Sequence, residues 1–150
     1  MTSQEILQNT MLFKGCGREE LVRILGLFQE RQINQNTIIF TENMHAEALY
    51  IVKSGSVRIS IMAGEGEELG LLVLGPGEFF GELALVQEGN RMVTARAETP
   101  VELLLLTRKD FQAMIELAPW AAARALMVIT KLLAMRVKTY SEKLKELLAP

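Results

Sequence analysis

The chain has almost none of the side chains that build metal sites, disulfides or hydrolytic triads. Its 150 residues include one cysteine, Cys16, and one histidine, His45. A zinc site needs several cysteines or histidines, and the metal site of a cupin-type jelly roll needs several histidines with a carboxylate. A lone cysteine also cannot form an intrachain disulfide. A Ser-His-Asp hydrolase would need His45 as its base, yet no nucleophile elbow occurs. We expect no metal, no cofactor, no catalytic residue and no enzymatic activity.

The sequence also lacks a long apolar run and an excess of positive charge. The 16 Lys and Arg residues stand against 18 Asp and Glu, a net charge of -2. This balance gives no general attraction to DNA or to an anionic membrane, so neither is expected as a direct partner. No stretch resembles a membrane span or a signal peptide. With a single cysteine, the expected location is the reducing cytoplasm.

Length and composition predict one domain, residues 1–150. A chain that is 49% hydrophobic can bury one sizeable core at this length. Apolar residues recur at helical spacing in residues 1–28 and again in residues 108–150. Residues 29–107 show strand-like alternation and frequent turn residues, which predicts a sandwich or barrel of short strands between flanking helices.

Two kinds of strand are expected in the middle section. Val57, Ile59 and Ile61 alternate with polar residues, as in a strand with one buried face. Residues 69–74 form an apolar run that predicts a strand buried on both sides. Residues 101–106 are the last expected strand.

Residues 80–97 carry the pattern that says most about function. Gly81 and Glu82 open a tight turn, residues 83–86 can form about one helical turn, and Arg91 follows. A short helix start attracts anions, and glycine lets a ligand approach the main chain. A guanidinium matches two phosphate oxygens, while a carboxylate suits a sugar hydroxyl. On residue types alone, however, an ordinary pair of solvated charges is the favoured interpretation.

Three motifs that occur in order along the chain favour the phosphate-binding interpretation instead. Residues 39–43 with 49–59, then residues 74–80, and finally residues 80–91 are similar to the signatures of cyclic nucleotide-binding domains. The third resembles the phosphate-binding cassette of that family, including the spacer before its arginine. The resemblance covers nearly the whole chain. It implies a mainly β fold, an eight-stranded double-sheet jelly roll with N-terminal helices and a long C-terminal helix, with the cassette between strands six and seven.

The resemblance also implies a ligand, a cyclic nucleotide. Glu82 would take the ribose 2'-hydroxyl and Arg91 the cyclic phosphate. Met92 stands where a small residue or a hydroxyl is usual, and because methionine donates no hydrogen bond, cyclic AMP is favoured over cyclic GMP. The complete set of expected ligand-binding residues is Gly81, Glu82, Leu83, Ala84, Arg91, Met92, Thr94, Tyr140 and Ser141.

The C-terminal helices begin at recognisable signals. Thr107 lies three residues before Asp110, a capping-box type of start. Pro119 suits the first turn of a final helix that is expected to run to about Leu148. This helix carries an apolar stripe with steps of four and three, formed by Leu126, Thr130, Leu133, Val137, Tyr140, Leu144 and Leu147.

The stripe admits two interpretations. It packs either on its own domain or against a second copy of the chain. The chain resembles the bacterial catabolite activator group in particular, which implies a homodimer through this helix and contact of Tyr140 and Ser141 with the base. That group continues into a DNA-binding domain, and both a free-standing sensor and a piece of a longer chain fit the sequence.

Two functions are therefore expected alternatives. The first is a regulatory sensor domain that binds a cyclic nucleotide, repositions its C-terminal helix and signals to an unidentified downstream protein. The second is a ligand-free jelly-roll scaffold or dimerisation module with a vestigial phosphate cassette. Asn43, Asn90 and Met92, which depart from the family pattern, keep this second function open.

Overall fold

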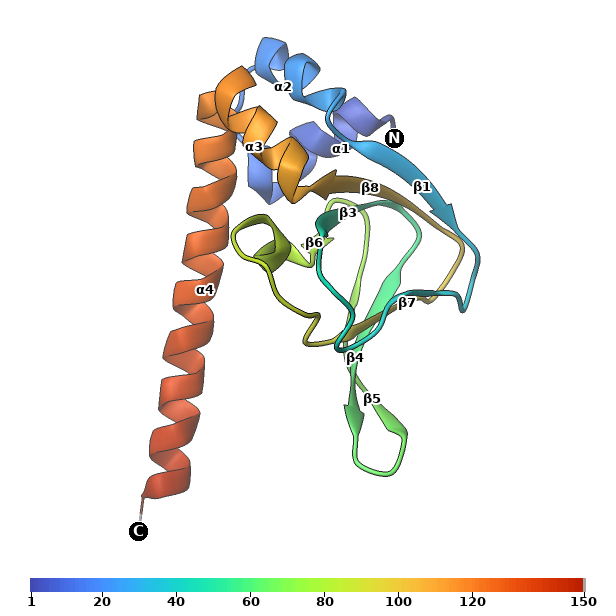
Figure 1. Cartoon of the computed structure of the whole chain (residues 1–150), viewed down its shortest axis with the longest axis vertical. Coiled ribbons are helices and arrows are strands. Elements are labelled where there is room, and N and C mark those ends of the chain that lie inside the picture. Colours follow the sequence, from blue (N-terminus) through green and yellow to red (C-terminus); the bar gives the residue numbers. More distant parts are fainter. Residues whose placement is uncertain (150) are drawn as a thin grey trace.

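Two antiparallel four-stranded sheets form the centre of the computed structural model, which describes residues 1–149 (Figure 1). One sheet has the strand order β1-β8-β3-β6, and the other has the order β2-β7-β4-β5. The N-terminal helices and α3 lie against the first sheet, while the long α4 extends past the strands. The predicted jelly roll with helices at both ends is confirmed.

The elements follow the order expected from the sequence. The strands are β1 (Gln29–Ile33), β2 (Ile38–Phe40), β3 (Ala48–Ser54), β4 (Val57–Ala63), β5 (Glu67–Leu74), β6 (Phe79–Phe80), β7 (Thr94–Ala97) and β8 (Val101–Thr107). The helices are α1 (Ser3–Asn9), the 3-10 turn η1 (Met11–Phe13), α2 (Arg18–Leu25), the 3-10 turn η2 (Glu82–Leu85), α3 (Arg108–Leu117) and α4 (Pro119–Leu148). As predicted, the cassette lies between strands six and seven.

The buried side chains form two clusters, where the sequence predicted one core between two sheets. Successive residues of a strand point to opposite faces, so β3 contributes to both clusters. Tyr50 and Val52 pack between the sheets, whereas Leu49 and Ile51 pack with the helices on the outer face of the first sheet. The first sheet is therefore covered on both faces, and this is the sheet that carries the helices.

The two apolar runs have opposite environments. In the central strand β8, Leu103 and Leu104 are fully buried, because strands flank it on both sides and helices cover it. The prediction that residues 69–74 are buried on both sides is wrong: Leu69 and Val73 are each 53% exposed. They belong to β5, which lies at the end of its sheet in a hairpin that projects from the body (Figure 1).

One polar residue of β4 departs from the predicted alternation of burial, next to a β-bulge in β5. The register between β4 and β5 shifts between Ile59 and Ser60. Val57 and Ile59 are buried as expected, but Ser60 is fully buried and Ile61 only half-buried. The buried Ser60 hydroxyl donates a 2.6 Å hydrogen bond to the Glu68 carboxylate of β5. The residue that the bulge inserts is Leu71 of β5, which has no partner in β4, and β4 itself pairs with β7 without a shift.

The predicted helix starts are confirmed. The Thr107 hydroxyl accepts a 3.1 Å hydrogen bond from the Asp110 backbone N–H and caps α3. Pro119 occupies the first turn of α4, and the helix ends at Leu148. Within residues 1–149, no helix is both long and apolar enough to cross a bilayer. The cytoplasmic location stays a prediction.

The first half of α4 supplies the apolar contacts of this helix with the core of its own domain. Ala121, Ala122, Ala125 and Ile129 are buried against the helical cluster. Small alanine side chains allow the helix to approach its neighbours closely. Beyond this part, the apolar stripe of α4 is exposed, with Val137 at 65%, Tyr140 at 64%, Leu144 at 56% and Leu147 at 82%.

The contrast between the apolar runs predicts unequal effects of the same substitution. Leu104→Ala should lower the free energy of unfolding by about 2–5 kcal/mol, because it leaves a cavity in a packed core. Leu69→Ala should change it by less than about 1 kcal/mol, because the side chain is half in water already. Urea unfolding followed by circular dichroism measures both. Equal losses would contradict the assigned environments.

Candidate functional site

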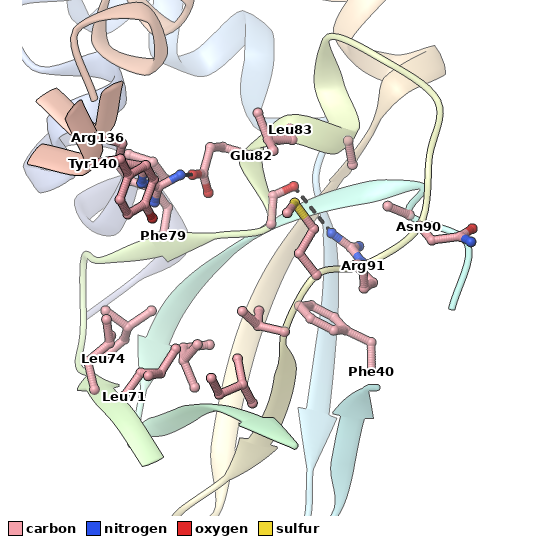
Figure 2. A pocket seen from close by; sticks show the side chains of 18 residues that line it. Phe40, Leu71, Leu74, Phe79, Glu82, Leu83, Asn90, Arg91, Arg136 and Tyr140 are labelled. Atoms are coloured by element: carbon pink, nitrogen blue, oxygen red, sulfur yellow. Dashed lines mark hydrogen bonds and ion pairs between the residues drawn. The ribbon is translucent and has the colours of Figure 1, made fainter. Parts of the chain in front are cut away.

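A cavity of about 570 Å³ lies between the cassette, the β4–β5 hairpin and the middle of α4 (Figure 2). Its lining is mostly apolar, and the charged side chains in it are those of Glu82, Arg91 and Arg136. Ligand pockets for small molecules are usually of this size and combine apolar walls with few polar groups. The cavity is therefore the candidate binding site.

Most of the residues predicted to bind a ligand line this one cavity. The lining includes Gly81, Glu82, Leu83, Ala84, Arg91, Met92 and Tyr140. Thr94 and Ser141 are outside it. Thr94 is buried, and its hydroxyl accepts a 3.3 Å hydrogen bond from the Glu42 backbone N–H. Ser141 is exposed on α4. Ligand contacts by these two residues stay predictions.

Gly81 forms the tight turn before η2 in a left-handed backbone conformation, with φ of 75°. A Cβ atom at this position would lie 2.6 Å from Nη1 of Arg91 and 3.2 Å from the carbonyl oxygen of Ala48. Glycine is thus needed for two reasons, because other residues disfavour this φ and because the arginine head occupies the space. The turn and the arginine are parts of one packing arrangement.

The Arg91 side chain lies inside the domain, where it is only 8% exposed. Its Nη2 donates a 2.7 Å hydrogen bond to the carbonyl oxygen of Ala48, and Nη1 donates a 3.3 Å bond to that of Gly81. Its Cζ lies 4.1 Å from the ring centroid of Phe40. Burial lowers the pKa of the Arg91 guanidinium, which nonetheless stays charged at neutral pH.

The backbone of Arg91 is also anchored. Its N–H donates to the carbonyl of Met44 at 2.7 Å, and its carbonyl accepts from the N–H of Asn43 at 2.8 Å. Asn43 has a φ of 69°, the left-handed conformation in which asparagine can replace glycine. A guanidinium carries more N–H donors than the two carbonyls use, so Arg91 can bind an anion without leaving its anchors.

Glu82 is paired with a residue of α4 that the sequence analysis did not select. Its side chain is 6% exposed, and its Oε1 accepts a 2.7 Å charge-assisted hydrogen bond from Nη1 of Arg136. Arg136 precedes the predicted Tyr140 by four residues and therefore shares its helix face. This spacing of four residues from Tyr140 could have identified Arg136 from the sequence. Figure 2 shows the two α4 side chains at one side of the cavity and Arg91 at the other.

Arg108 is a second residue that the sequence analysis missed. From the start of α3, its Nη1 donates hydrogen bonds of 3.0 Å to the carbonyls of both Ala84 and Gln87. These carbonyls lie at the end of the cassette helix, where a cation is favoured. The cassette is thereby held at both ends, by Arg91 at its beginning and by Arg108 at its end.

A protein-family comparison assigns residues 30–117 to a model described as "Cyclic nucleotide-binding domain". The "Cyclic AMP receptor protein" of Thermus thermophilus is 39% identical over 132 residues, which are 88% of this chain and 59% of that protein. The chain thus spans about three fifths of the length of this relative.

Solved structures show the same similarity. The Thermus thermophilus catabolite activator protein superposes with a TM-score of 0.81 at 38% identity, over 92% of this chain and 63% of that chain. The regulatory domain of Toxoplasma gondii PKA, crystallised with cAMP, gives a TM-score of 0.66 at 34% identity, over 74% of this chain and 42% of that chain.

Proposed function

This chain belongs to the cyclic nucleotide-binding domain family, and from that premise we propose that it is a non-enzymatic sensor domain that binds cyclic AMP. The observation that carries the proposal is the anchored guanidinium of Arg91 at the cavity, with N–H donors left over for a phosphate. The cyclic AMP named in the relatives' descriptions supports the choice of ligand.

In the proposed complex, each part of the nucleotide meets matching chemistry. The cyclic phosphate pairs with Arg91 in the manner of a charge-assisted hydrogen bond. The ribose 2'-hydroxyl donates to the carboxylate of Glu82. The base lies in the apolar part of the cavity, where Tyr140 can stack on it and offer a hydroxyl. Met92 stands where a hydroxyl would favour cyclic GMP, and because it has none, cyclic AMP is favoured over cyclic GMP.

The Glu82–Arg136 pair offers a route from ligand to helix. A ribose hydroxyl that donates to Oε1 of Glu82 competes with Arg136, whose Nη1 donates to that oxygen. The ligand would then have unequal affinity for the placement of α4 in which the pair is made and for one in which it is broken. Such unequal affinity is what a ligand needs in order to shift a conformational equilibrium. We propose that the change of α4 from one placement to the other is the signal that this sensor gives.

The exposed half of α4 supports a homodimer as the assembled form. In this half the apolar stripe is exposed to solvent at Val137, Tyr140, Leu144 and Leu147. A heptad stripe that its own domain does not cover can be covered by the same stripe of a second copy. A scaffold without ligand would use this surface equally, so assembly and ligand binding need separate tests.

Replacing Arg91 by lysine tests the ligand site. Arg91→Lys keeps the positive charge but loses the planar fork, so cyclic AMP should bind roughly 10- to 100-fold more weakly. Arg96→Lys is the matched control, because Arg96 pairs with Glu68 away from the cavity. Calorimetric titration with cyclic AMP and cyclic GMP, after refolding to remove co-purified ligand, measures both. Wild-type protein that binds neither nucleotide would favour the scaffold function.

Hydrogen exchange tests the coupling to α4. Cyclic AMP should change the exchange of amides in residues 130–148 of the wild-type protein. Arg136→Ala should change the same amides without ligand, since it removes the contact between α4 and the cassette. Lys138→Ala on the same helix serves as the control. Identical exchange in free and bound wild-type protein would refute the proposed movement.

Sedimentation velocity tests the dimer. Wild-type protein should sediment as a dimer at micromolar concentration. Leu144→Asp should give monomers, because it places a charge in the apolar stripe, whereas Thr139→Asp, outside the stripe, should leave the dimer intact. A wild-type monomer under these conditions would contradict the assembly.

A further inference from the structure

We infer that Phe40 is a positioning residue for Arg91: its ring holds the guanidinium in the plane in which it meets the phosphate. The inference rests on the proposed function, in which Arg91 binds that phosphate. Phe40 lies in β2, 51 positions before Arg91 in the chain, and its side chain has no polar group. Figure 2 shows Phe40 directly beside the arginine head.

The ring of Phe40 belongs to a packed group of three aromatic side chains. Its centroid is 5.8 Å from that of Tyr50 and 5.9 Å from that of Phe80, and the last two rings are stacked 5.2 Å apart. All three are at least nine-tenths buried. They come from β2, β3 and β6, so both sheets contribute to the group. A ring packed in this way has little freedom to tilt.

The guanidinium is restrained in two different directions. The carbonyls of Ala48 and Gly81 accept its N–H groups and restrain it within its own plane. The Phe40 ring, 4.1 Å from Cζ, restrains it perpendicular to that ring. Tyr50 lies farther away, with its centroid 5.6 Å from Cζ. A cation over an aromatic face is attracted by the ring quadrupole, and the attraction is stronger where water is excluded.

Phe40 also has an ordinary role in the core, which the test must separate. Phe28 offers the comparison, because it is buried in the other cluster and packs on Phe13 rather than on Arg91. Loss of either ring to leucine costs core packing. Only the loss at position 40 removes the aromatic face under the guanidinium.

The test compares Phe40→Leu, Phe28→Leu and Phe40→Tyr, the last of which keeps the aromatic face. The first measurement needs no ligand. In a nitrogen-proton NMR spectrum, the Nε–H signal of Arg91, assigned with Arg91→Lys, should be displaced by the ring current of Phe40. Phe40→Leu should remove the displacement, while Phe28→Leu and Phe40→Tyr should retain it.

The second measurement is calorimetric titration with cyclic AMP. Phe40→Leu should weaken binding roughly tenfold, Phe40→Tyr should restore it, and Phe28→Leu should leave it unchanged. An Arg91 signal that is not altered by Phe40→Leu would overturn the inference, as would equal losses of affinity in the two leucine variants. If the Arg91 signal depends on Phe40 but the wild-type protein binds no cyclic nucleotide, the proposed function fails while Phe40 still positions Arg91.

Discussion

A buried positive charge must be paired, and the centre of this domain is built around that requirement at Arg91. Removing a guanidinium from water is costly unless hydrogen bonds replace its hydration. Here the replacements are two backbone carbonyls and an aromatic face. They come from β3, the cassette turn and β2, three segments that only the closed jelly roll brings together. The same packing requires a glycine at position 81.

The cassette is therefore a loop with fixed ends. Arg91 restrains its first turn from the β-sheet side, and Arg108 restrains its last carbonyls from α3. Because Arg108 begins the helical section that continues into α4, the cassette is connected to the C-terminal helices through its backbone carbonyls. The Glu82–Arg136 pair adds a second connection, farther along α4. In this second connection the Arg136 side chain is 43% exposed whereas that of Glu82 is 6% exposed, so water can replace Glu82 as the partner of Arg136.

The two halves of α4 differ in packing because their side chains differ. Alanines allow the first half to pack closely on the helical cluster, and this part has no freedom to move without disturbing the core. The second half extends beyond the domain, with its apolar stripe in water and Arg136 reaching the cassette. Leu71 and Leu72 of β5 are also about half exposed, and they line the cavity opposite this half of the helix.

Local signals in the sequence were sufficient to predict the strand and helix sections, the capped start of α3 and the extent of α4. These features depend on neighbouring residues, which a sequence shows directly. The double sheet and the position of the cassette followed from the family resemblance. The tertiary structure decided which apolar run is buried: residues 69–74 and 101–106 look alike, but the first lies at a sheet edge and the second at a sheet centre. It also decided the contacts Arg136–Glu82 and Phe40–Arg91, which join residues 54 and 51 positions apart. Such pairs form because the sheets close and α4 folds back, and no local pattern encodes that closure.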